Sequence, residues 1–339
     1  MSVRVLGLAL LTLTLVGCGG GDGAADSARP TVVVTTSILG DVVGNLAGDE
    51  FDVVTIMPVG ADPHDFQPSA QQVAQIGEAD VLIANGGGFE VGLADVIESA
   101  EADGVPTFEA LSAVETLDFG DETHADHEAD GAEEVEVHEE EAHEDEAHEE
   151  EDGHEGGEHE EGVDPHFFTD PARMAVATDA IAKFLADNVD GVDADVLSLS
   201  AEEYVDQLEA LDAEVEELLS VIPEDRRVLV TNHEVFGYFA DRYDFEVVGT
   251  VIPGGSTTDG ADAAALDALA QTVTDRNVPA IFAETSSSGA LAETLADEAG
   301  DVEVVELFSE SLGDPDSEGG TYLDMVRTNG ERIAAALSA

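Results

Sequence analysis

The segment DADVLSLSAEEYVDQLEALDAEVEELLSVI at residues 193–222 decides how the whole chain is organised. Its apolar residues recur at three- and four-residue intervals, a period that predicts one long amphipathic helix ending at Pro223. A helix of about 25 residues is roughly 38 Å long, which is enough to cross a junction between two domains. The residues that set the period are Val196, Leu197, Leu199, Tyr204, Leu208, Leu211, Val215, Leu218 and Leu219.

Strand and helix patterns alternate on both sides of this predicted helix. Before it, β-branched or apolar runs predict strands at 31–37, 51–57, 80–84 and 105–108, and helical spacing predicts helices at 38–47, 70–76, 91–99 and 171–188, the second of them capped by Ser69. After it, strands are predicted at 227–231, 245–251, 280–283 and 302–307, with helices at 233–243, 261–276, 289–299 and 321–337. Such alternation is typical of a parallel sheet with helices on its faces.

The fold class predicted from this order is α/β, with two Rossmann-like lobes that each have a central parallel sheet. The N-terminal lobe spans residues 31–190, the C-terminal lobe spans 226–339, and residues 191–225 form the rigid helix between them. A length of 339 residues suits two medium domains. Ligands of open α/β sheets bind at the carboxyl ends of the strands, so the binding site is expected in the cleft between the lobes.

The chain is extremely acidic. It has 10 Lys and Arg residues against 78 Asp and Glu residues, a formal net charge of −68. This charge argues against nucleic-acid binding, which needs a basic surface. It also implies self-repulsion unless salt screens the charges, so a salty habitat is one interpretation.

The N-terminus has the pattern of an export signal. Arg4 precedes an apolar run at 5–16, which is too short for an ordinary membrane span. The residues Leu15-Val16-Gly17-Cys18 resemble a bacterial lipobox, which predicts a signal peptide at 1–17, lipidation of Cys18 and a flexible tether at 18–30. The alternative is a plain secretory peptide. Cys18 is the only cysteine, so the mature chain has no internal disulfide and no thiolate for a zinc site.

A second unusual stretch, which we call the His/acid tract, lies at 121–162 and consists almost entirely of histidine, carboxylates, Ala and Gly. It has too few apolar side chains to form a core, so it is predicted to be a disordered insertion. One interpretation is metal capture, and the other is a solvated acidic linker. Several histidines are five residues apart, which puts them on different helix faces and favours weak separate sites. The tract histidines are His124, His127, His138, His143, His148, His154 and His159.

Three histidines stand outside the tract, and each is at a loop or at the carboxyl end of a predicted strand. His64 lies in Asp-Pro-His-Asp, His166 lies in Asp-Pro-His-Phe-Phe, and His233 directly follows Thr-Asn. A single histidine at such a position is more often a structural hydrogen-bonding group than a metal ligand. Three histidines in equivalent positions favour a shared metal site.

Several motifs stand in a fixed order across essentially the whole mature chain. The motifs are Pro63-His64-Asp65-Phe66-Gln67-Pro68-Ser69, Asp164-Pro165-His166, Val230-Thr231-Asn232-His233 with Phe236 and Tyr238-Phe239, Phe282-Ala283-Glu284-Thr285, and Phe308-Ser309-Glu310-Ser311 before Thr321-Tyr322. In their sequence and spacing, these motifs resemble those of the metal-binding lipoproteins of bacterial ABC importers for zinc and manganese, the cluster A-I or ZnuA/TroA-like family.

The resemblance implies a metal site in the cleft and a role in transport. His64 and His166 match the two N-lobe ligands, and His233 matches the C-lobe ligand. Glu310 matches an acidic position that is usually Asp, and water is the alternative fourth ligand. The expected function is a monomeric zinc-binding component that passes Zn²⁺ to an ABC permease and its ATPase. The expected location is the outer face of the cytoplasmic membrane, where a lipid anchor holds the protein to the bilayer.

The nature of the ligands favours zinc over manganese. Manganese relatives usually have Glu where this chain has His233, and zinc prefers nitrogen donors in a four-coordinate shell. Zinc relatives also often have a His- and acid-rich loop at the place of the tract. Manganese or another divalent metal is the alternative cargo, since copper and nickel also suit imidazole.

Two other functions fit parts of the pattern. Three histidines with a vacant fourth position also occur in zinc hydrolases, with Asp65 or Glu234 as a candidate general base. The sequence has neither an HExxH helix nor a GxSxG elbow, so an enzyme is not expected. A zinc buffer of the cell envelope that has no transporter is the remaining alternative.

Overall fold

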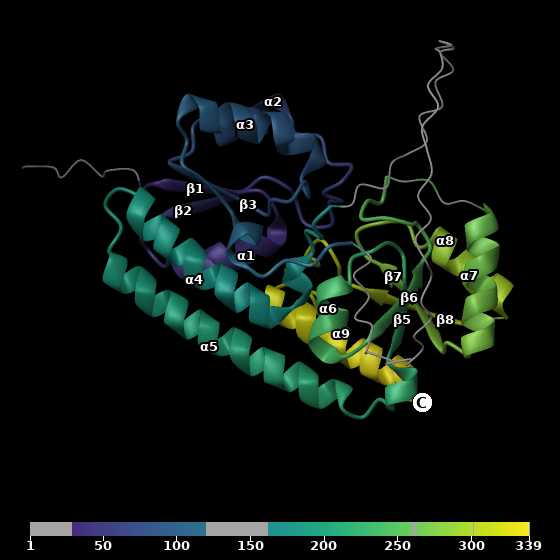
Figure 1. The fold of residues 1–339 in the computed structure, drawn as a ribbon. Coiled ribbons are helices and arrows are strands. Elements are labelled where there is room, and N and C mark those ends of the chain that lie inside the picture. The colour runs from purple at the N-terminus through teal and green to yellow at the C-terminus, as the bar shows by residue number, and fades with distance from the viewer. Residues whose placement is uncertain (1–28, 120–161, 259, 261–262, 301, 339) are drawn as a thin grey trace, which may run out of the picture.

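The computed structural model describes residues 29–119, 162–258, 260, 263–300 and 302–338, and these residues contain two four-stranded parallel sheets (Figure 1). The first has the order β2-β1-β3-β4, and the second has the equivalent order β6-β5-β7-β8. The predicted fold class is therefore confirmed. The strands are β1 (Thr31–Val34), β2 (Asp52–Thr55), β3 (Val81–Ala84), β4 (Thr107–Glu109), β5 (Val228–Thr231), β6 (Glu246–Thr250), β7 (Ala280–Glu284) and β8 (Glu303–Leu307).

The first sheet is buried on both faces because its apolar residues alternate in direction along each strand. Val32 and Val34 of β1 pack with helices α1 and α4, whereas Val33 points to the opposite face, toward α2 and α3. The elements of this lobe are α1 (Ser37–Ala47), α2 (Ala70–Gly77), the 3₁₀ turn η1 (Val91–Leu93), α3 (Ala94–Asp103), η2 (Ala110–Ala113), η3 (Phe167–Thr169) and α4 (Pro171–Asn188).

The second sheet repeats this arrangement. Val230 and Ile281 face α7 and α8, whereas Leu229 and Phe282 belong to the core that also contains α6 and α9. This core, which contains α6 and α9, also contains Val32 and Val34 of β1 and buried apolar residues of α1 and α4. The two lobes therefore share one packed interior. The elements are η4 (Glu224–Arg226), α6 (Gly237–Tyr243), α7 (Ala263–Arg276), α8 (Ala290–Ala299) and α9 (Tyr322–Leu337).

The long helix predicted from the apolar period is present as α5 (Ala194–Leu219), whose 26 residues make it about 39 Å long. Asp193 caps its first turn by accepting from the amides of Asp195 and Val196. Figure 1 shows α5 running under the first sheet toward the second. Its apolar side packs against α4, α1 and α9. The buried residues are Leu197, Ala201, Tyr204, Leu208, Leu211, Val215 and Leu219.

The C-terminal helix α9 also connects the two lobes, which the sequence did not indicate. It packs along α5, and its first residue bonds to the N-terminal lobe twice. The Tyr322 hydroxyl donates to the Phe168 carbonyl (2.7 Å), and the Tyr322 amide donates to Asp41 Oδ2 (3.0 Å). The boundaries at residues 190 and 226 therefore stay a prediction, because the last helix belongs to both lobes.

One helix boundary was predicted wrongly. The helix expected from residue 233 begins at Gly237 instead. Local bonds hold the preceding turn out of helical geometry: the Thr231 hydroxyl donates to the His233 carbonyl (2.8 Å), and the Val235 amide donates to the same carbonyl (3.0 Å). The His233 side chain is thereby fixed at the end of β5 rather than on a helix. In the part of the chain that the structure describes, no helix has the length and apolar character needed to cross a membrane.

Candidate metal centre

Four side chains from separate loops converge between the two sheets. His64 lies in the loop after β2, His166 precedes η3, His233 follows β5, and Glu310 follows β8. One ligand atom from each residue lies within 4.8 Å of the other three, and all four residues are buried. The structure therefore brings together all four residues that the motifs indicated, and three of them lie in loops that follow strands, where ligands of such sheets bind.

The carboxylate of Glu310 stands at the centre of this group. Its Oε1 atom lies 2.7 Å from His64 Nε2, 3.3 Å from His233 Nε2 and 3.5 Å from His166 Nε2. None of these contacts has hydrogen-bond alignment, so all four atoms are buried without a hydrogen-bond partner. Buried polar atoms without partners are costly. A cation bound among them would satisfy all four at once.

Two further carboxylates orient two of the imidazoles from behind. Asp164 Oδ1 lies 2.7 Å from His166 Nδ1, and Glu284 Oε1 lies 2.7 Å from His233 Nδ1. A carboxylate can only accept, so Nδ1 carries a proton in each ring, and Nε2 is the nitrogen that faces the centre and can bind a cation once it is deprotonated. Carboxylates behind ligating histidines fix the tautomer and raise the basicity of the ligand.

Neighbouring charged groups shift the pKa values of His166, His233 and Glu310. Burial alone would lower the pKa of His166 and His233, but Asp164 raises the first and Glu284 raises the second well above the ordinary value. Burial alone would raise the pKa of Glu310, yet the three surrounding histidines hold it well below its usual range. The site therefore keeps a carboxylate ionised in a buried setting, which is the state that binds a cation.

A buried polar network positions the His166 loop. Asn85, which directly follows β3, donates through Nδ2 to the Pro165 carbonyl (2.9 Å). Glu90 is buried and accepts from the Thr35 hydroxyl and the Asn85 amide, each at 2.6 Å. Burial raises the pKa of Glu90 despite these donors. The carboxyl end of the first sheet is thus braced behind the site.

Asp164 and Glu284 were not assigned roles from the sequence, although both lie in the quoted motifs. A signal was available for Asp164, since both Asp-Pro-His motifs carry a carboxylate two residues before the histidine. Glu284 ends β7, at the same sheet edge as His233. The two candidate general bases stand outside the cluster: Asp65 is exposed, and Glu234 lines a neighbouring pocket.

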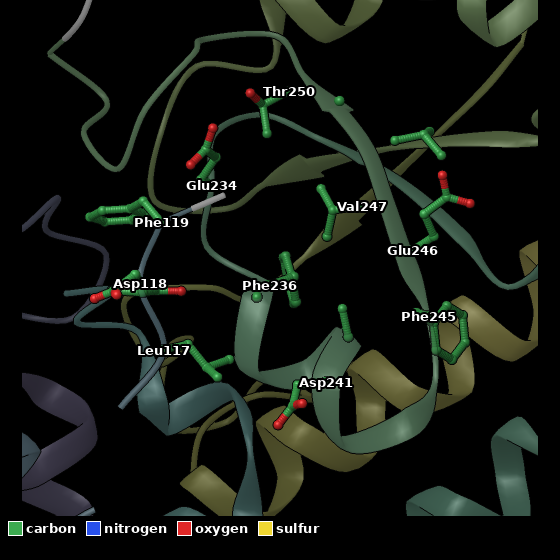
Figure 2. Close-up of a pocket in the computed structure, with 15 residues that line it drawn as sticks. Leu117, Asp118, Phe119, Glu234, Phe236, Asp241, Phe245, Glu246, Val247 and Thr250 are labelled. Atoms are coloured by element: carbon green, nitrogen blue, oxygen red, sulfur yellow. The ribbon is translucent and has the colours of Figure 1, made fainter. Parts of the chain in front are cut away.

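That neighbouring pocket lies beside the cluster, between the segment just before the His/acid tract and strand β6 (Figure 2). Leu117, Asp118 and Phe119 form one wall, and residues 245–250 line another. Its lining includes five carboxylates and no basic side chain, so an anionic ligand does not suit it. The carboxylates are Asp118, Asp164, Glu234, Asp241 and Glu246. Cys18 and the seven tract histidines lie outside the described residues.

A two-lobed α/β fold with a buried His₃Glu cluster in the cleft defines a class of metal-binding proteins. The family model described as the zinc-uptake complex component A, periplasmic (ZnuA), matches residues 32–336, and the chain belongs to this family. Proteins of this family are the substrate-binding components of metal ABC importers and work with a permease and an ATPase.

Individual relatives match over nearly their whole length. The zinc-binding protein TroA of Treponema pallidum is 31% identical over an alignment of 339 positions, which covers 98% of this chain and 97% of the relative. The manganese-binding lipoprotein MntA of Halalkalibacterium halodurans is 25% identical, over 97% of this chain and 96% of the relative. The solved structure of periplasmic zinc-binding TroA superposes with a TM-score of 0.74 at 28% identity, covering 92% of this chain and 100% of that one.

Proposed function

We propose that this protein binds Zn²⁺ as cargo through His64, His166, His233 and Glu310 and delivers it to an ABC permease driven by an ATPase. The observation that carries the proposal is the set of three imidazole Nε2 atoms around one ionised carboxylate, all buried without hydrogen-bond partners. We also propose that the chain acts as a monomer at the outer face of the membrane, held there by a lipid on Cys18.

The choice of zinc rests on the donor set. Three nitrogens and one oxygen suit the four-coordinate shell of Zn²⁺, whereas Mn²⁺ prefers oxygen-rich shells with more ligands. The relatives include both a zinc-binding and a manganese-binding protein, so manganese is the competing cargo.

A competition titration tests the proposed cargo. Metal-free protein is titrated with Zn²⁺ and with Mn²⁺ in the presence of a chelator of known affinity. One tight zinc per chain is expected, with manganese binding at least about 100-fold more weakly because the site offers a single carboxylate to an oxygen-seeking ion. Equal or tighter binding of Mn²⁺ would make the protein a manganese carrier.

The same titration tests the role of the His/acid tract in metal binding. We propose that its histidines capture zinc weakly and keep it at high effective concentration near the tight site. The tract can be removed cleanly, because Phe119 and Gly162 at its two ends are hydrogen-bonded (3.1 Å) and Asp118 bridges to Val163. Replacing residues 120–161 with Asn-Gly, a two-residue hairpin connection, should abolish the weak sites and preserve the tight one. Loss of the tight site in this variant would reverse the two roles.

A further inference from the structure

The loop that follows β6 contacts the N-terminal lobe beside the proposed ligands. Thr257 in this loop donates its hydroxyl to Asp62 Oδ2 at 2.5 Å, across 195 residues of sequence. The other oxygen of the same carboxylate, Oδ1, accepts the backbone amide of His64 at 2.9 Å. A single side chain of the N-terminal lobe therefore links Thr257 of the opposite lobe to a ligand.

The two Asp-Pro-His motifs use their aspartates differently. Asp164 Oδ1 accepts both the amide of His166 (2.9 Å) and its ring Nδ1 (2.7 Å), so one residue fixes the backbone and the imidazole. Asp62, by contrast, bonds to the backbone amide of His64 rather than to its ring, and its other oxygen accepts from Thr257. Within the described ranges, no carboxylate pairs with His64 Nδ1, whereas His166 and His233 each have one there. His64 is thus the proposed ligand with the least support from its own lobe.

A second contact of the same loop bears on the N-terminal lobe. The ring of Phe119 lies against Gly255 so closely that a Cβ added at Gly255 would stand 2.0 Å from Phe119 Cζ. Phe119 in turn lies 6.2 Å from the His166 ring, measured between ring centroids. Figure 2 shows Phe119 beside the pocket that both lobes line. The loop therefore contacts the N-terminal lobe at two points, Asp62 near His64 and Phe119 near His166.

We propose that Thr257 is a positioning residue that sets how long the metal stays bound. Its hydroxyl holds Asp62 in place, and Asp62 holds the His64 backbone over the metal, so the two lobes are joined at the ligand that has the least support. Without the Thr257 bond, the loop at residues 62–64 gains freedom to move His64 away from the metal. This inference rests on the proposed function, and it predicts an effect on the rate of metal release.

The test measures zinc dissociation from the full chain loaded with one equivalent of Zn²⁺ and mixed with excess chelator. Thr257→Val removes the donor with little change in shape and should release zinc about tenfold faster, because a hydrogen bond to a charged group is lost. Thr257→Ser keeps the hydroxyl and should remain within about twofold of the unmodified rate. Thr258→Val is the matched control, since the exposed Thr258 hydroxyl bonds only within the loop, to Ser256 (2.8 Å), and should leave the rate unchanged.

Each outcome decides the proposal. An unchanged rate in Thr257→Val, or an equally fast rate in Thr257→Ser, would overturn it, because the hydroxyl would then not be responsible. Thermal unfolding of the metal-free variants shows that they fold, and Thr257→Ala replaces Thr257→Val if the latter does not. The His64→Ala variant distinguishes a failure of the Thr257 proposal from a failure of the proposed metal site. If His64→Ala bound zinc as tightly as the unmodified chain, the site itself would be wrong, whatever the effect of Thr257→Val.

Discussion

The His233→Ala variant is expected to lose tight zinc binding. His233 is the only proposed nitrogen ligand from the C-terminal lobe, so its removal leaves the metal held mainly by the other lobe and by Glu310. Loss of a partner behind a ligand typically costs 10–100-fold in affinity, and loss of the ligand itself should exceed about 100-fold. Competition titration against a chelator measures the change.

Thermal unfolding provides an independent readout of the same change. A ligand present at 100 times its Kd stabilises the native state by about 2.7 kcal/mol, so zinc should raise the melting temperature of the unmodified protein and not that of His233→Ala. Glu234→Ala is the control, because Glu234 is the neighbouring residue and lines the adjacent pocket instead of the cluster. Its affinity should stay within about threefold of the unmodified protein. If His233→Ala bound zinc as tightly as the unmodified chain, the site would lie elsewhere.

The second large effect is expected at Glu284, which never touches the metal in this account. Glu284 Oε1 accepts from His233 Nδ1 (2.7 Å) and from the His233 amide (3.2 Å), and Oε2 accepts from the Ser309 hydroxyl (3.2 Å). Glu284→Gln keeps the shape and an acceptor but removes the charge that makes the imidazole more basic. Zinc affinity should fall by about 10–100-fold, as is typical for partners behind metal-bound histidines.

A neighbouring glutamate gives the matched comparison. Glu306 lies on β8, directly opposite Ala283 of β7, and its side chain is exposed. Glu306→Gln makes the same chemical change without touching a histidine, so its affinity should match that of the unmodified protein. Equal affinity in Glu284→Gln and Glu306→Gln would show that the carboxylate behind His233 contributes nothing to binding.

The fold followed from the sequence because its local signals agree with one another. The apolar period in residues 193–222 predicted the long helix, and the buried stripe of α5 lies on that same period. Ser69 caps α2 with a full capping box to Gln72, as its position before the helix indicated. The role of α9 could not be read from its sequence, because an amphipathic pattern shows that one face is buried without showing which lobe covers it.

The site was predictable in its centre and not in its surroundings. The three histidines stood out because they are the only ones outside the tract, each at a loop or at the end of a predicted strand, and Glu310 was indicated by its match to a family motif. Asp164 had a local signal in its Asp-Pro-His motif that was not used, whereas nothing local distinguishes Glu284 from the many other carboxylates of the chain or Thr257 from its other threonines. Their roles depend on contacts across the fold, such as the bond between Thr257 and Asp62 over 195 residues. The predicted helix start at His233 was wrong for a different reason, because hydrogen bonds within the turn itself, from Thr231 and Val235 to the His233 carbonyl, outweigh the apolar spacing.

The most direct measurement of the central claim is zinc X-ray absorption spectroscopy on the tract-replaced protein loaded with one equivalent of metal. We expect a four-coordinate shell of three imidazole nitrogens and one carboxylate oxygen at about 2.0–2.1 Å. The imidazole signal should fall by one third in His233→Ala. A shell of oxygens alone, or a spectrum that His233→Ala leaves unchanged, would contradict this claim.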